Sequence, residues 1–284
     1  MLPMPAAARP PCHHASMSDS RAPHAMLLIV LVIAGCASGP TAREWGASAT
    51  VAPGWERVRA SAANAIRDPW VWAPLVGAAL FQIDDWDHDV SDWAQRETPI
   101  FGSQRAAEDW SDYLRDGAAL TYVASVVVTP SGDGAETWLV NKAKGYAVGL
   151  AAIVATGSTT NALKSAADRE RPDESERRSF PSGHSSRAAV STRLASRNLE
   201  YLPLGPRSRL AANAGLNALT IGTGWARIEA GKHFPADTLV GTAIGNFFAN
   251  FFNDAFLDPQ RAGGTSVEFA PLPGGAELRV AVSF

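Results

Sequence analysis

Apolar residues recur at helical spacing through most of the chain beyond residue 55. Such segments flank Pro69 and continue to residue 128, where a stretch rich in Gly, Pro and Ser (129–136) interrupts the pattern. Further helices are predicted over 137–165, 184–197, 208–224 and 236–256. In the last of these, one stripe carries Val240, Ile244, Phe247, Phe248 and Phe251. The pattern predicts an all-α fold, a helical bundle over 55–258.

The C-terminal tail, 259–284, has a different period. Alternation in "AELRVAVSF" places Leu278, Val280, Val282 and Phe284 on one face, and the preceding "PGG" is a turn signal. We expect a short β-hairpin here, because one or two strands cannot close a barrel.

The N-terminus is typical of a secretory signal. An apolar stretch from Met26 to Ala34 follows the basic Arg21 and is too short to span a membrane. We assign 1–35 to this signal, with Met17 the better start. "IAGC" resembles the bacterial lipoprotein signal, in which Cys36 receives the lipid, and residues 36–54 would form a tether. Ordinary cleavage near Ala37 is the alternative.

These features predict a periplasm-facing lipoprotein of the cell envelope, and Ala37 after the cysteine favours the outer membrane. No segment reaches 18 uninterrupted apolar residues, so we expect a water-soluble helical domain held at the membrane by its lipid. The nine tryptophans are expected mostly in the core. A net charge of −3 argues against nucleic acid as a partner. The sequence predicts no oligomeric state.

The acidic stretch "DDWDHDVSDW", residues 84–93, could suggest a metal site. A calcium-binding EF-hand loop would need glycine at position 90 and glutamate at 96, where Val90 and Arg96 stand. We therefore interpret Asp85, Asp87 and Asp89 as part of an acidic, tryptophan-bearing helix face, either packed or near the membrane surface, and predict no metal.

The first of three stretches with candidate chemistry is "KSAADRERP". Lys164 and Arg171 are seven residues apart and share a helix face if the helix continues to Pro172. Paired cations suit a phosphate. Asp168 and Glu170 lie in the same run, so a solvated face is the alternative.

The second stretch is "SFPSGHSSRAA". Ser182 is a natural helix N-cap, and Gly183 lets the backbone approach a ligand closely. Free N–H groups at a helix start bind anions, and His184 would sit beside the anion with a proton to donate. Capping without a bound anion is the alternative.

The third stretch is "ARIEAGKHFPAD". Pro235 suits a first helical turn, which places His233 just ahead of a helix. Asp237 could reach one ring nitrogen of His233 and leave the other free to attack, while Arg227 supplies a third cation. A capped helix with a surface histidine is the alternative.

Together these stretches resemble the three signature motifs of the type 2 phosphatidic acid phosphatase superfamily, which includes bacterial class A acid phosphatases and vanadium haloperoxidases. The family pattern is Lys-x6-Arg-Pro, then Pro-Ser-Gly-His, then Ser-Arg-x5-His-x3-Asp. The chain departs from it at Ala226, where the family usually has serine. The loss of that hydroxyl could weaken phosphate binding.

The resemblance implies a helical bundle of the acid phosphatase and haloperoxidase type, and it implies a role for each motif residue. His233 would attack phosphorus, His184 would protonate the leaving oxygen, and Asp237 would orient His233. The phosphoryl oxygens would be held by Lys164, Arg171, Ser182, Gly183 and Arg227. The implied activity is phosphatase action without a metal or other cofactor, on a phosphomonoester or pyrophosphate that is either a small molecule or a lipid.

Two alternatives stay open at this stage. A vanadate-dependent haloperoxidase would use nearly the same oxyanion pocket, although the family's haloperoxidases are generally much longer. A non-catalytic envelope lipoprotein would not need His184, His233 and Asp237, which are all present.

Overall fold

The structure, a computed structural model, describes residues 44–258, 266–272 and 275–281. It is helical, and the predicted all-α fold is confirmed. The predicted signal segment and the lipidation site at Cys36 lie outside the described residues. The helices are α2 (Trp55–Arg67), α3 (Pro69–Leu80), α4 (Trp86–Glu97), α5 (Gln104–Val128), α6 (Ala135–Ala167), α7 (Gly183–Asn198), α8 (Pro206–Glu229) and α9 (Pro235–Phe252), with short 3-10 and π turns at Leu199–Tyr201 and Asn253–Leu257.

Helix boundaries follow local chemistry. Asp68 caps α3 by accepting a hydrogen bond from the Trp70 backbone, and Ser103 caps α5 in the same way through Ala106. Pro206 and Pro235 occupy the first turns of α8 and α9, where the missing backbone N–H leaves no hydrogen bond unmade. Because these signals are local, the sequence predicts most helix ends to within a few residues.

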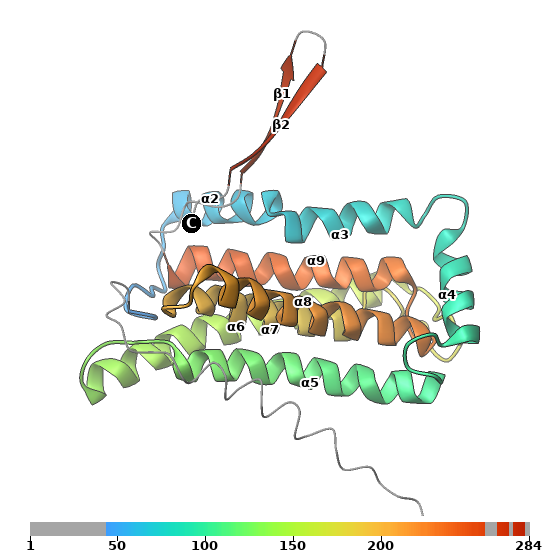
Figure 1. The fold of residues 1–284 in the computed structure, drawn as a ribbon, viewed down its shortest axis with the longest axis horizontal. Helices are drawn as coiled ribbons and strands as arrows, with labels where there is room; N and C mark the ends of the chain where they lie inside the picture. The colour runs from blue at the N-terminus through green and yellow to red at the C-terminus, as the bar shows by residue number, and fades with distance from the viewer. Residues whose placement is uncertain (1–43, 259–265, 273–274, 282–284) are drawn as a thin grey trace, which may run out of the picture. The chain divides into compact units, whose positions relative to one another are not determined.

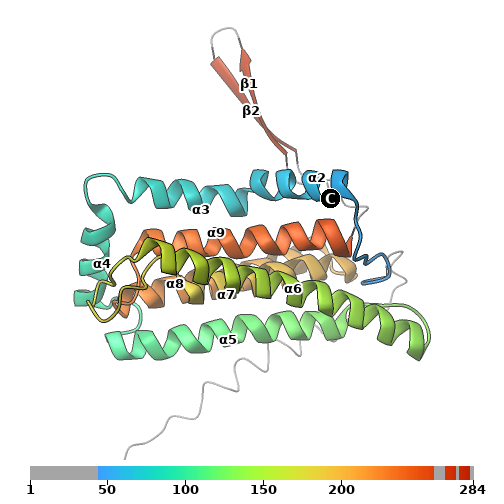
Figure 2. The same ribbon diagram turned by 180° about the vertical axis from the view of Figure 1, so that it is seen from behind.

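Helix α9 is the central element. It packs against α2, α3, α6, α7 and α8, and Figures 1 and 2 show it between α3 and the layer formed by α6, α7 and α8. Helix α5 lies on the other side of that layer, against α7 and α8. At one end of the bundle, α4 stands beside the loop that joins α6 to α7 (Figure 1). This is the end where the three sequence stretches meet.

The crossing of α7 and α9 is unusually close. A Cβ atom on Gly241 would lie 2.4 Å from the Ser182 carbonyl oxygen, and one on Gly245 would lie 2.4 Å from the Ser186 carbonyl oxygen. Both distances are below any real carbon–oxygen contact. The two glycines therefore allow α9 to lie directly against the backbone at the start of α7, which holds Ser182 and His184.

We expect Gly241→Ala to lower the free energy of unfolding by about 1–3 kcal/mol, because the added methyl forces two backbones apart. Chemical denaturation measures this change. The control is Gly157→Ala in α6, where an added Cβ would meet nothing within 4 Å, so alanine's helix propensity should leave stability unchanged or raised. Equal stability of Gly241→Ala and wild type would contradict the close crossing.

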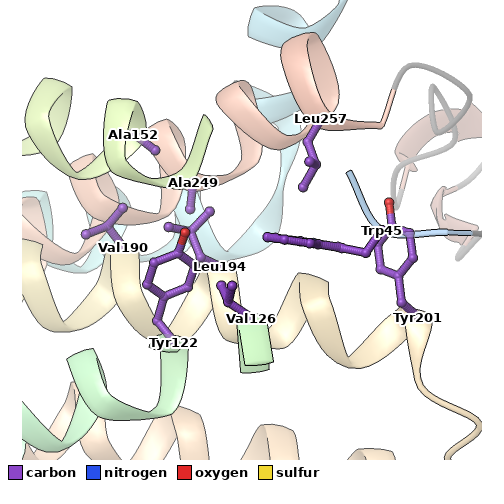
Figure 3. Packing of buried hydrophobic residues seen from close by; sticks show 9 residues of the cluster. All are labelled: Trp45, Tyr122, Val126, Ala152, Val190, Leu194, Tyr201, Ala249 and Leu257. Atoms are coloured by element: carbon purple, nitrogen blue, oxygen red, sulfur yellow. The ribbon is translucent and has the colours of Figure 1, made fainter. Parts of the chain in front are cut away.

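The hydrophobic core includes a residue that the sequence analysis placed in the tether. Trp45 is 1% exposed and packs in one cluster with Val126, Leu194 and Leu257 (Figure 3). Its indole N–H donates to Asn198 Oδ1 at 2.8 Å. The predicted tether, 36–54, is therefore wrong at its C-terminal end, and the packed domain begins no later than Trp45.

The chain crosses α6 directly after Trp45. Gly46 has a φ of +85°, and a Cβ there would lie 2.1 Å from the Asn141 carbonyl oxygen. Only glycine satisfies both conditions. The sequence marks this position as part of a small-residue linker, but its neighbours show a tightly packed crossing.

The tryptophan prediction was also wrong. Trp45 is in the core, but seven of the nine tryptophans are among the exposed large hydrophobic side chains: Trp55, Trp70, Trp72, Trp86, Trp93, Trp110 and Trp138. None of the described helices combines the length and apolar content needed to cross a bilayer. In the tail, β1 (Ser266–Leu272) pairs antiparallel with β2 (Gly275–Ala281), with Phe269 opposite Leu278.

Candidate active site

Helix α6 ends close to the predicted residue 165 and does not continue to Pro172. It stops at Ala167, and Asp168 takes a left-handed conformation with φ of +44°. Lys164 therefore lies in the last helical turn, while Arg171 lies in the following loop. The shared helix face predicted for Lys164 and Arg171 is wrong, and the loop, instead of the helix, determines where Arg171 lies.

Lys164 is buried beside the start of α7. Its Nζ donates to the Arg178 carbonyl oxygen at 2.5 Å, and a Cβ on Gly183 would lie 3.8 Å from Lys164 Cε. Burial, together with the nearby Arg171 guanidinium, lowers the pKa of Lys164 to about 8. A bound anion would favour the charged ammonium again.

Arg171 and Arg227 bring two more cations to the same place. Arg171 is mostly buried and pairs with Glu176 at 3.1 Å, and Arg227 Nη1 donates to Ser111 Oγ at 3.2 Å. Burial lowers the pKa of Arg227 to about 10, and the like charge of Arg171 adds to this. The charge of Arg171 thus lowers the pKa values of both Lys164 and Arg227, and a bound anion would offset this repulsion.

Several nitrogen atoms in this cluster have no acceptor. Among the described residues, Arg171 Nε, Arg227 Nε and His233 Nδ1 are buried and make no hydrogen bond. A buried donor without a partner is normally satisfied by water or a ligand. With three cations next to them, these atoms favour a ligand with several anionic oxygens.

Ser182 and Gly183 form the turn that opens α7. Ser182 is fully buried and is the N-cap of α7, with its Oγ accepting a hydrogen bond from Ser185 Oγ at 3.1 Å. Its backbone N–H donates to the Asp237 carbonyl oxygen at 2.9 Å. The turn is thus bonded to the first turn of α9, which brings the second and third sequence stretches together.

His233 is buried directly before α9. Burial lowers its pKa to about 4; Asp237 acts in the opposite direction, while Arg227 and Lys164 add to the lowering. The ring is therefore neutral at pH 7. Its Nδ1 lies 3.8 Å from Asp237 Oδ2, an ion-pair distance that is too long for a hydrogen bond. The Nε2 atom is the ring nitrogen that Asp237 does not face.

Asp237 is fully buried and has a full set of donors. Its Oδ2 accepts hydrogen bonds from Ser179 Oγ at 2.5 Å and from the Phe234 N–H at 3.0 Å, and its Oδ1 accepts from Arg169 at 2.7 Å. Burial alone would raise the pKa of Asp237, but His233, Arg169 and Ser179 hold it below its usual value. The carboxylate is therefore ionised and fixed in place.

His184 faces helix α5. Its Nε2 lies 2.8 Å from Asp112 Oδ1 and 2.7 Å from Arg115 Nη1. One nitrogen cannot donate to the carboxylate and accept from the guanidinium at once, so the protonation state of His184 selects between the two contacts. Burial and Arg227 lower the pKa of His184 to about 4, and Asp112 opposes them.

The structure thus brings all eight sequence-predicted site residues to one end of the bundle, and their roles stay predictions. It adds residues that the motifs did not reveal: Asp87, Asp112, Arg115, Arg169 and Ser179. Of these, Arg169 and Ser179 flank motif residues in the sequence, whereas Asp87, Asp112 and Arg115 carried no local signal. Within the described part of the chain, no three His, Cys, Asp or Glu residues are grouped to hold a metal ion.

Comparison with known proteins agrees with the motif pattern. Residues 145–259 match the model of the PAP2 superfamily, and this range contains all eight predicted residues. This part of the chain is similar to the PAP2 superfamily. No curated protein matches the chain. One similar solved structure is described as the crystal structure of the first transmembrane PAP2 type phosphatidylglycerolphosphate phosphatase from Bacillus subtilis. Its sequence is 20% identical to this chain, the match covers 65% of this chain and 92% of that chain, and the TM-score is 0.49.

Proposed function

We propose that the protein is a phosphatase that hydrolyses phosphomonoesters or pyrophosphates through a phosphohistidine intermediate and without a metal. The observation that carries this proposal is the convergence of Lys164, Arg171 and Arg227 on the neutral, buried His233, with donor atoms left unpartnered among the described residues. The match of residues 145–259 to the PAP2 superfamily model supports phosphatase activity.

Substrate binding would satisfy Arg171 Nε and Arg227 Nε. The three cations and the N–H groups at the start of α7 would hold the phosphoryl oxygens and stabilise the charge that builds on them during transfer. Fixed positive charge in a water-poor site is the main contribution that a protein makes to this chemistry, and here side chains alone can supply it.

In the first step, the lone pair of His233 Nε2 forms a bond to phosphorus while the bond from phosphorus to the leaving oxygen breaks. His184 donates its proton to that oxygen, which leaves as an alcohol or as a phosphate. Asp237 faces Nδ1 and stabilises the positive charge that the phosphorylated ring carries.

In the second step, His184 removes a proton from water, and the water oxygen attacks phosphorus. The bond from phosphorus to Nε2 breaks, inorganic phosphate leaves, and both histidines return to their starting states. The arrangement of Asp112 and Arg115 around His184 suits this double role, because each protonation state of the ring has its own partner.

The groove beside the site favours a substrate with an apolar leaving group. A cavity of about 440 Å³ adjoins the loop before α7. Its lining is mostly apolar, with Arg169 and Gln82 as its polar members: Leu75, Ala78, Ala79, Gln82, Arg169, Phe180, Ala236 and Val240. A lipid phosphate would fit this chemistry. Lipidation at Cys36 and a place in the cell envelope belong to the same proposal.

The test is trapping of the intermediate. The full chain is mixed in EDTA with a phosphomonoester, a pyrophosphate or a phosphorylated lipid in vesicles, and then quenched in base, where phosphohistidine survives. We expect phosphate release with each accepted substrate and a phosphoryl group located on His233 by mass spectrometry. Loss of release in EDTA would contradict metal independence, and a phosphoryl group on another residue would contradict the nucleophile.

A further prediction concerns Asp112→Asn. Asp112 opposes the lowering of the His184 pKa, so its removal lowers that pKa further. Because the proposed acid must be protonated, the basic limb of the kcat/KM pH profile should move to lower pH by about one unit, the effect of losing an opposite charge at hydrogen-bond distance. The control is Asp116→Asn, which removes another partner of Arg115. An unmoved limb in Asp112→Asn would remove Asp112 from this role.

A further inference from the structure

Asp87, in the first turn of α4, points inward although it lies in an otherwise exposed acidic stretch. It is 2% exposed, and the neighbouring acidic residues Asp84, Asp85 and Asp89 are all exposed. Of the two interpretations left open for this stretch, packed or near the membrane surface, Asp87 is packed. A buried carboxylate is retained only with partners that offset the loss of water, and both of its oxygen atoms have one.

One oxygen of Asp87 holds a cation. Its Oδ2 lies 2.7 Å from Arg169 Nη2, while Nη1 of the same guanidinium donates to Asp237 Oδ1, also at 2.7 Å. Arg169 therefore bridges two buried carboxylates from α4 and α9. The guanidinium carbon also lies 4.0 Å from the centre of the Phe234 ring, which fixes its plane.

The other oxygen of Asp87 holds the start of α9. Its Oδ1 accepts a hydrogen bond from the Ala236 N–H at 2.8 Å. Asp87 thus acts on the chain immediately after His233 in two ways: through the backbone at Ala236, and through Arg169 on Asp237. Both connections converge on the segment that carries the proposed nucleophile.

The net charge of Asp87, Arg169 and Asp237 affects the neighbouring His233 ring. With both carboxylates ionised, Asp87, Arg169 and Asp237 sum to −1 + 1 − 1 = −1. Without Asp87, Arg169 would neutralise Asp237, and no net negative charge would face the ring of His233. The other charged groups acting on that ring are the cations Lys164 of α6 and Arg227 of α8. The negative charge of the trio is what offsets them.

We propose that Asp87 is a positioning residue for His233, acting through Arg169 and Asp237. It keeps the Asp237 carboxylate aligned and negatively charged, so that His233 carries its proton on Nδ1 and presents Nε2 to phosphorus. The effect on catalysis rests on the proposed phosphatase function, but the effect on the His233 ring does not.

The test compares Asp87→Asn, Arg169→Gln and the double variant in the full chain. Asparagine can still accept from Ala236 but cannot pair with Arg169. We expect Asp87→Asn to lower kcat for a phosphomonoester about 10- to 100-fold, the range known for outer partners of functional histidines, with KM changed less than about twofold. The double variant should be no slower than Arg169→Gln, because Asp87 influences Asp237 through Arg169 and has no such effect once Arg169 is replaced.

The matched control is Asp89→Asn, an exposed carboxylate on the same helix, which should behave as wild type. Nitrogen NMR of histidine-labelled protein gives a readout independent of turnover: the Nδ1–H form of His233 should predominate in wild type and lose population in Asp87→Asn. If Asp87→Asn fails to fold, Asp87→Glu, which keeps the charge and moves the carboxylate by one methylene, carries the comparison.

Each outcome decides the proposal. An unchanged kcat in folded Asp87→Asn would overturn it. So would a double variant whose loss of kcat equals the product of the losses in Asp87→Asn and Arg169→Gln, or an unchanged proton position on His233. If wild type releases no phosphate from any substrate, the phosphatase proposal fails, and the NMR comparison still decides whether Asp87 positions His233.

Discussion

Replacing His233 with alanine is expected to lower kcat for phosphate release by about 10³-fold or more, the largest effect of any single change in this protein. The reason is that His233 is the neutral ring beside Lys164 and Arg227, whereas His184 faces Asp112 and Arg115 on α5. The measurement is steady-state phosphate release in EDTA, together with trapping of the phosphoenzyme.

The matched control for this variant is His88→Ala. His88 is about half exposed, and its ring packs at a tilt against that of Phe234 with ring centres 4.5 Å apart, so it adjoins the site without facing the cations. It should retain most of the activity. If His233→Ala released phosphate as fast as His88→Ala, His233 would not be the nucleophile, and the cation cluster would need another role.

The second large effect is on stability. We expect Trp45→Ala to lower the free energy of unfolding by about 3–5 kcal/mol, the usual result of removing a buried tryptophan. Asn198 also loses the donor to its Oδ1, and the ring leaves a void among Val126, Leu194 and Leu257 (Figure 3). Since domains are typically stable by about 5–15 kcal/mol, this is a large fraction. Chemical denaturation of the full chain measures it.

Two controls separate burial from hydrogen bonding. Trp45→Phe keeps most of the ring and loses the bond to Asn198, so it should lie between wild type and Trp45→Ala. Trp55→Ala removes a tryptophan that is 73% exposed and should change stability by about 0.5 kcal/mol or less. A small loss in Trp45→Ala would mean that the segment around Trp45 is a dispensable tether after all.

The helices and the three motif stretches could be predicted from the sequence because their causes are local. Hydrophobic period, N-caps such as Ser182 and first-turn prolines such as Pro235 act within a few residues. The spacing of Lys164, Arg171, His184, His233 and Asp237 is likewise a property of the chain, and it was enough to indicate phosphate chemistry.

The loop after α6 shows what local reasoning could not supply. The predicted helix ended at residue 165 and α6 stops at Ala167, but Arg169 in the following loop binds carboxylates on two other helices. Those bonds favour the loop conformation, and no local sequence pattern predicts them.

The sequence by itself thus determined the helical fold class and the chemistry of the motif residues. Only the tertiary structure decided that Trp45 belongs to the core, that Asp87 turns inward, and that Asp112 meets His184. Their partners lie 153, 82 and 72 residues away along the chain, at Asn198, Arg169 and His184. The free energy that fixes such residues comes from burial and charge pairing between distant segments, and a single segment's sequence does not contain it.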